Sequence, residues 1–123
     1  MNILVVDDSE MMRGIIKKAI EDNTEGELPL NFFEASNGQE ALDHLNETKI
    51  DIVFLDWNMP VLDGLTFVKQ VRGGGDQTPI AMITSVTDED RILEAGKAGV
   101  NTYIEKPVRG SRLWEQIKQF IQS

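Results

Sequence analysis

Residues 3–20 read ILVVDDSEMMRGIIKKAI, and this stretch holds the two patterns that decide the fold. The four apolar residues Ile3 to Val6 predict a short strand that is covered on both faces. After Asp7 and Asp8, apolar residues recur at the i, i+3, i+4, i+7 spacing of one helix face, which either Asp8 or Ser9 can cap. That face comprises Met12, Ile15, Ile16, Ala19 and Ile20. A buried strand followed at once by an amphipathic helix is the unit from which α/β folds are built.

This alternation continues through the rest of the chain. Further apolar runs rich in Val, Ile and Phe predict strands at Asn31 to Ala35, Asp51 to Leu55, Pro79 to Thr84 and Thr102 to Glu105. Helical spacing follows at Ala41, Leu42 and Leu45 after the turn Asn37-Gly38, at Leu65, Val68 and Val71 after the cap Asp63, from Asp88 to Ala98, and from Ser111 to about Gln122. Right-handed crossovers then predict an α/β fold, a doubly wound five-stranded parallel sheet with five helices, as a single domain over residues 1–123.

Several residues are expected to serve packing or connection. The fourth helix has a thin apolar stripe that includes Leu93, so we expect it to be the least rigid helix. The single histidine, His44, is expected to be solvated or packed. The run Gly73-Gly74-Gly75 predicts a flexible connector, because no Lys-Ser or Lys-Thr pair follows it as in a phosphate-binding loop. Core or loop filling is expected of Met11, Met12, Met59, Met82 and Trp114.

The composition excludes several classes of protein. The chain has 21 acidic and 12 basic residues, and its net charge of −9 repels nucleic-acid backbones and anionic membranes. It contains no cysteine, so disulfides, thiolate nucleophiles and thiolate metal sites are excluded. No apolar run approaches the roughly 20 residues that span a bilayer, and the first residues lack the basic segment of a secretory signal. We therefore expect a cytoplasmic protein that binds neither nucleic acid nor membrane.

Polar side chains stand at the ends of four of the five predicted strands. Asp7 and Asp8 follow the first strand, and Asp56 follows the third. Thr84 closes the fourth strand, and Lys106 follows the fifth. Since the carboxyl ends of parallel strands meet at one edge of the sheet, where α/β folds bind their ligands, we expect these side chains to share one site.

The chemistry of these residues suits a cation and a phosphoryl group. Three crowded carboxylates repel one another, and either protonation or a hard cation bound through oxygen relieves the repulsion; Mg²⁺ is the natural candidate for the cation. Lys106 would bring a positive charge to a phosphoryl oxygen, and Thr84 would bring a hydroxyl donor. Asp56 is left as the nucleophile, since a carboxylate can attack phosphorus to form an acyl phosphate. Taken singly, Asp8 also fits a helix cap and Lys106 a solvated loop residue.

The same residues belong to longer motifs that resemble, in order and spacing, the receiver domain of bacterial two-component response regulators. The motifs are Asp7-Asp8-Ser9, Asp56-Trp57-Asn58-Met59-Pro60, Asp63-Gly64, Thr84-Ser85 and Tyr103-Ile104-Glu105-Lys106-Pro107. The resemblance covers the whole chain. It implies a flavodoxin-like three-layer sandwich with strand order 2-1-3-4-5, and a cis peptide bond before Pro107. Trp57 and Asn58, beside the acceptor, are most similar to stand-alone chemotaxis regulators (CheY type).

The resemblance also implies how the site would work. Asp56 would accept a phosphoryl group from a phosphohistidine of a sensor histidine kinase. Asp8, Asp56 and the backbone carbonyl of Asn58 would bind Mg²⁺, with Asp7 assisting largely through water. Lys106 would hold a phosphoryl oxygen.

A switch in conformation is implied as well. On phosphorylation Thr84 would move to bond the new group, and Tyr103 would turn inward. The fourth helix, fifth strand and fifth helix would form the output face, for an output protein such as a flagellar motor switch in a chemotaxis or motility pathway. We expect a monomer that is no enzyme beyond its own phosphotransfer and autodephosphorylation.

Two positions depart from the family pattern and leave the pathway open. Val108 stands after Pro107 where many relatives have an aromatic residue, and Val86 stands where the chemotaxis type often has an acidic one. An apolar Val86 cannot orient an attacking water, so Val86→Glu is expected to alter the phosphoryl lifetime more than the Mg²⁺ affinity. An unchanged phosphoryl half-life in that variant would refute the hypothesis.

Two other functions use the same residues. An Mg²⁺-dependent small-molecule phosphohydrolase would need the same nucleophile and cation, but the chain is too short for a lid or a second domain that would enclose a substrate. A receiver-like binding module that works without phosphorylation is the second alternative. The intact set of site residues argues against it.

Overall fold

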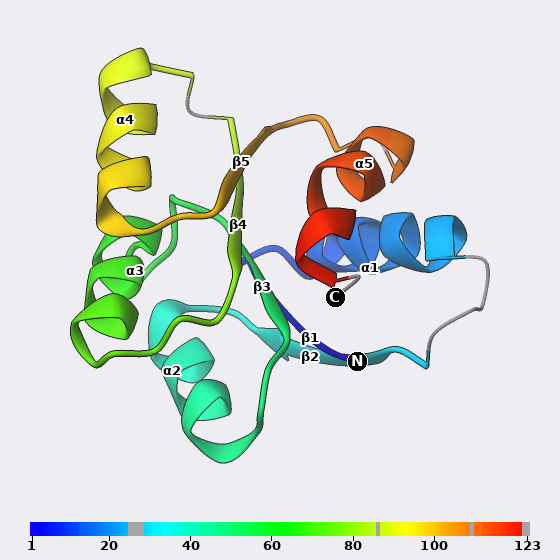
Figure 1. The fold of residues 1–123 in the computed structure, drawn as a ribbon, viewed down its shortest axis with the longest axis horizontal. Helices are drawn as coiled ribbons and strands as arrows, with labels where there is room; N and C mark the ends of the chain where they lie inside the picture. Colours follow the sequence, from blue (N-terminus) through cyan, green and yellow to red (C-terminus); the bar gives the residue numbers. More distant parts are fainter. Residues whose placement is uncertain (25–28, 86, 109, 122–123) are drawn as a thin grey trace.

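A computed structural model describes residues 1–24, 29–85, 87–108 and 110–121 of the chain (Figure 1). The strands are β1 (Asn2–Val6), β2 (Asn31–Ala35), β3 (Ile52–Leu55), β4 (Ile80–Thr84) and β5 (Thr102–Glu105). The helices are α1 (Glu10–Thr24), α2 (Gly38–Glu47), α3 (Gly64–Gly73), α4 (Glu89–Ala98) and α5 (Gly110–Ile121). The strands form one parallel sheet in the order β2-β1-β3-β4-β5, which confirms the expected fold and strand order.

The bounds predicted for the five strands and for the fourth and fifth helices agree with the observed ones to within a residue at each described end. Ser9, not Asp8, caps α1, because its hydroxyl accepts a hydrogen bond from the backbone N–H of Met12. Asn37 caps α2, Asp63 caps α3 and Asp88 caps α4. Gln122, at which the last helix was expected to end, and Val86 lie outside the described residues. The peptide bond between Lys106 and Pro107 is cis, as the resemblance implied.

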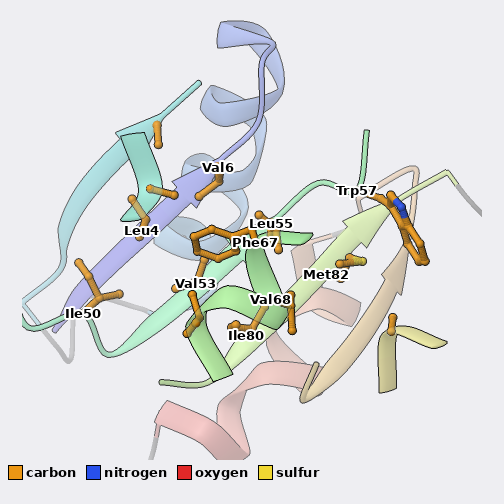
Figure 2. Packing of buried hydrophobic residues seen from close by; sticks show 14 residues of the cluster. Leu4, Val6, Ile50, Val53, Leu55, Trp57, Phe67, Val68, Ile80 and Met82 are labelled. Carbon is orange, nitrogen blue, oxygen red and sulfur yellow. The ribbon is translucent and has the colours of Figure 1, made fainter. Parts of the chain in front are cut away.

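Helices cover both faces of the sheet, with α1 and α5 on one face and α2, α3 and α4 on the other (Figure 1). Alternate side chains of β1 serve the two sides: Leu4 and Val6 pack toward α2 and α3, while Ile3 and Val5 pack toward α1 and α5. Phe67 of α3 packs in the apolar cluster that contains Leu4 and Val6 (Figure 2). Burial on both faces explains why the strands read as continuous apolar runs.

Three apolar side chains are exposed: Ile15 and Leu93, which were placed on the apolar faces of their helices, and Met11, for which core or loop filling was expected. Met11 is 77% exposed, Ile15 is 45% exposed and Leu93 is 62% exposed. Helical spacing identifies the direction of the buried face, but the neighbouring elements decide how wide a stripe they cover. On α1 the covered stripe is narrow and leaves Ile15 at its edge, whereas Ile16 and Ile20 are buried.

The remaining packing expectations hold for the described residues. Trp114 packs against the cluster between the sheet and α1 and α5. The ring of His44 packs edge-on against Phe33, and its Nε2 lies 2.9 Å from the carbonyl oxygen of Glu34. No helix in the described ranges is long and apolar enough to cross a membrane.

Val61 has a strained backbone conformation. It lies between β3 and α3 with φ +69°, and its side chain is 82% exposed. A left-handed conformation costs a residue with a Cβ about 1–2 kcal/mol, most for a β-branched one, whereas Asn tolerates it. We expect Val61→Asn to raise the free energy of unfolding by about 1 kcal/mol, measured by urea denaturation. Leu93→Asn, an exposed apolar residue in a regular helix, is the control, and an equal effect in both variants would contradict this explanation.

Candidate functional site

The predicted site residues stand at the carboxyl edge of the sheet, where ladder hydrogen bonds continue past the strands. The N–H of Asp7 donates to the carbonyl of Ala35 at 3.1 Å, and the N–H of Asp56 donates to the carbonyl of Val6 at 3.0 Å. These bonds extend β1 and β3 by one residue, so both carboxylates begin from rigid backbone. The N–H of Lys106 donates to the carbonyl of Thr84 at 2.9 Å in the same way.

Three carboxylates converge at this edge. Asp7, Asp8 and Asp56 each offer an oxygen, and these oxygens lie within 4.8 Å of one another. Asp7 is 2% exposed and Asp56 is 7% exposed, whereas Asp8 faces solvent. The cluster is therefore anchored in the interior and open on one side, and the expected meeting of Asp7 and Asp8 occurs.

Lys106 bridges the two buried carboxylates. Its Nζ lies 3.5 Å from Oδ2 of Asp7 and 3.5 Å from Oδ2 of Asp56. Burial raises the pKa of Asp56, the charge of Lys106 opposes this shift, and the charge of Asp7 adds to it. The ionised form of Asp56 is therefore destabilised by its surroundings, and an additional cation nearby would stabilise it.

The donor set fits a hard divalent cation. It consists of carboxylate oxygens, which Mg²⁺ prefers, and the exposed side leaves room for the waters that this ion retains. Asn58, whose carbonyl was expected to complete the set, is exposed in the loop that follows Asp56. The residues present therefore suit the ion that the sequence implied.

Thr84 and Tyr103 lie on the β4 and β5 side of the cluster. Thr84 is fully buried at the end of β4, and it pairs in register with Glu105 of β5, the residue before Lys106. Tyr103 is half-buried and lines a groove of about 440 Å³ between α4, β5 and α5. Burial raises the pKa of Tyr103, and the charge of Arg91 opposes that shift. The aromatic ring thus belongs to the wall of a surface groove on the expected output face.

The loop from Asp56 to α3 is closed by a short backbone contact. The N–H of Gly64 donates to the carbonyl of Trp57 at 2.8 Å. A Cβ on Gly64 would lie 2.5 Å from the carbonyl oxygen of Asp56 and 2.9 Å from Cα of Trp57. Only glycine allows this approach, so Gly64 fixes the backbone of the acceptor loop.

Arg13 is a residue at the site that sequence reasoning missed. Its Nη1 donates to the backbone carbonyl of Asp7 at 2.6 Å, and its Nε donates to the carboxylate of Glu34 at 2.9 Å. Arg13 therefore ties α1 to the end of β1 and to β2. The only signal in the sequence was a basic residue in the first helix, which says nothing about its distant partner.

Glu34 provides a test of these contacts through pH. Hydrogen bonds from Lys17 and Arg13 lower the pKa of Glu34 below its ordinary value of 4.5. Because the folded pKa is the lower one, ionised Glu34 stabilises the fold above the unfolded pKa, and the contribution is lost as pH falls through the folded pKa. We expect Glu34→Gln to lower stability at neutral pH by less than about 1 kcal/mol, since the pairs are partly exposed, and to flatten the loss of stability in acid. Thermal denaturation of both proteins from neutral pH to about pH 3 measures this, and parallel curves would contradict it.

The chain is similar in sequence to proteins of one known family. The family model for the response regulator receiver domain matches residues 3–118. The chain is 42% identical over 124 residues to chemotaxis protein CheY1 of Helicobacter pylori, with 96% of this chain and 94% of that protein covered. It is 36% identical over 128 residues to chemotaxis protein CheY-3 of Vibrio cholerae, with 99% and 92% covered.

Solved structures agree with this match. A Vibrio cholerae chemotaxis protein CheY4 superposes with a TM-score of 0.84 at 30% identity, with 97% of each chain covered. The receiver domain of a Francisella response regulator superposes with a TM-score of 0.86 at 28% identity, with 97% of this chain and 94% of that chain covered.

Proposed function

The chain belongs to the response-regulator receiver family, and on this basis we propose that it is a signalling switch whose phosphoryl acceptor is Asp56. One observation carries the proposal: the Asp56 carboxylate lies 3.5 Å from Lys106 within a cluster of three carboxylates that is open to solvent on one side. Such a site can admit a phosphoryl donor, balance the incoming charge and keep the product attached. Phosphorylation-dependent signalling accounts for all three properties.

We propose that Asp7, Asp8, Asp56 and the carbonyl of Asn58 hold Mg²⁺, which when bound neutralises charge on the transferred group. An oxygen of Asp56 forms the new bond to phosphorus. The bond from phosphorus to the imidazole nitrogen of a kinase phosphohistidine breaks, and its electron pair stays on that nitrogen, which takes up a proton from solvent. Lys106 faces a phosphoryl oxygen, and the Thr84 hydroxyl donates to another after the transfer.

The output is proposed to be read on the α4-β5-α5 face. The groove of about 440 Å³ on this face has Ile92, Tyr103 and Leu113 in its lining, so it offers apolar surface to a partner. Tyr103 stands on β5, the strand that leads to Lys106, and also lines the groove, so this strand links the two places. The named relatives support a chemotaxis or motility pathway, with a sensor histidine kinase upstream and an output protein, such as the flagellar motor switch, downstream.

We further propose that residues 1–123 form one receiver domain that acts as a monomer in the cytoplasm and binds neither membrane nor nucleic acid. Its only chemistry would be its own phosphotransfer and autodephosphorylation. The open site supports this limit on its chemistry, because within the described residues no lid covers the carboxylates and encloses a substrate.

The proposal is tested by incubating the full chain with acetyl phosphate and Mg²⁺ and following its intact mass. We expect each chain to gain a single phosphoryl group, and we expect EDTA to prevent the gain. Sustained hydrolysis of p-nitrophenyl phosphate, with many phosphate groups released per chain, would support a phosphohydrolase instead. No gain in mass and no turnover would overturn the assignment.

A further inference from the structure

Helix α4 makes an unusual contact with the residue beside the acceptor. Its first turn carries Glu89 and Asp90, as the positive end of a helix dipole favours, and then a cation, Arg91. The guanidinium carbon of Arg91 lies 5.8 Å from the centroid of the Trp57 ring, within the range of a cation–π contact. Trp57 directly follows Asp56, is 8% exposed, and lies at the carboxyl end of the strands (Figure 2). Arg91 thus joins α4 to the acceptor loop.

The charge of Arg91 is available to a new anion. Among the described residues no carboxylate lies within ion-pair distance of Arg91, and its side chain is exposed. Its charge acts on Tyr103 of β5, where it opposes the rise in pKa that burial causes. A cation near the carboxyl edge of the sheet that rests on an aromatic face will respond to added negative charge there.

We propose that Arg91 is a positioning residue that couples the place of α4 to the charge on Asp56. This rests on the proposed function. While Asp56 is a free carboxylate, the guanidinium stays on Trp57 and holds the first turn of α4 to the acceptor loop. A phosphoryl group on Asp56 adds three acceptor oxygens and a negative charge that is larger by about one unit. These attract the guanidinium away from the ring.

The consequence reaches the output face through the next residue. Ile92 follows Arg91 on α4 and lines the groove together with Tyr103. When Arg91 leaves Trp57, the first turn of α4 is released from the acceptor loop, and the wall that Ile92 forms shifts with it. Arg91 therefore supplies a physical connection from the charge of the acceptor to the shape of the groove.

The test uses Trp57 fluorescence in a Trp114→Phe background, where Trp57 is the only tryptophan of the chain. Arg91→Gln and Arg91→Lys are compared with Lys97→Gln, a matched cation in the last turn of α4. In the unmodified protein, Arg91→Gln should increase acrylamide quenching of Trp57 about twofold, as expected for loss of an exposed cation–π contact. Arg91→Lys should restore part of the protection, and Lys97→Gln should change nothing.

The second arm adds acetyl phosphate and Mg²⁺, with occupancy of Asp56 measured by intact mass. Phosphorylation should raise the quenching of Trp57 in the parent, which is the Trp114→Phe variant, and in Lys97→Gln. It should leave the quenching in Arg91→Gln unchanged, although all three proteins gain the phosphoryl group. Equal quenching of Arg91→Gln and the parent before phosphorylation overturns the inference, and so does an equal rise in both after it. Absence of the mass gain in the parent overturns the proposed function itself, and the two failures are thereby distinguished.

Discussion

Asp56→Asn is expected to reduce phosphoryl uptake from acetyl phosphate by at least about 100-fold while the chain still folds. The amide has the shape of the carboxylate, so the backbone bond from Asp56 to Val6 and the packing around it can persist. Its oxygen carries no negative charge and is a poor nucleophile toward phosphorus. The time course of intact mass with Mg²⁺ measures the effect.

The same substitution should stabilise the protein in EDTA. Burial and the charge of Asp7 raise the pKa of Asp56, so the folded state bears a cost for the ionised carboxylate at neutral pH. A neutral amide removes that cost, although Lys106 retains Asp7 as a partner at 3.5 Å. We expect the melting temperature to rise by a few degrees.

Asp43→Asn is the matched control, because Asp43 is an exposed carboxylate on α2, away from the acceptor. It should leave both labelling and melting temperature unchanged. Labelling that persists in Asp56→Asn would move the acceptor to another residue. An unchanged or lower melting temperature would show that the buried charge is better solvated than its surroundings suggest.

The location of the site was predictable because it depends on local patterns that the fold brings together. Asp7, Asp56 and Lys106 each follow an apolar run, and parallel strands place such residues at one edge whatever the details of packing. Asp63 was similarly recognisable as a cap from its position before helical spacing, and Ser9 was one of two candidates, beside Asp8.

Other features depend on distances between elements that are remote in sequence. Arg13 of α1 pairs with Glu34 of β2, and Arg91 of α4 contacts the ring of Trp57 in the acceptor loop. No local pattern contains these pairs, because they arise only when helices settle against the sheet. The positive φ of Val61 was missed for a different reason, since the residue type argues against the conformation that the loop imposes.

Gly64→Ala, which adds one methyl group, is expected to destabilise the fold more than a methyl group added at any other position near the site. The new Cβ would lie 2.5 Å from the carbonyl oxygen of Asp56 and 2.9 Å from Cα of Trp57. Both are backbone atoms, which cannot rotate away as a side chain can, so the acceptor loop itself must move. We expect a loss of about 2–3 kcal/mol in the free energy of unfolding, the upper range for an overpacked position, measured by urea denaturation.

The displacement should also slow phosphoryl transfer, since the atoms that must give way belong to the acceptor and its neighbour. In-line transfer depends on placement, and an error of about 1 Å can cost about 100-fold in rate. Gly96→Ala is the control: nothing lies within 4 Å of its added Cβ, and in the interior of α4 it should gain about 0.5–1 kcal/mol. Labelling is compared where every variant is folded. A destabilised Gly64→Ala that labels at the parent rate would mean that the loop absorbs the methyl group without moving the Asp56 carboxylate, and the geometry of the acceptor would then depend on β3 and Lys106 rather than on this turn.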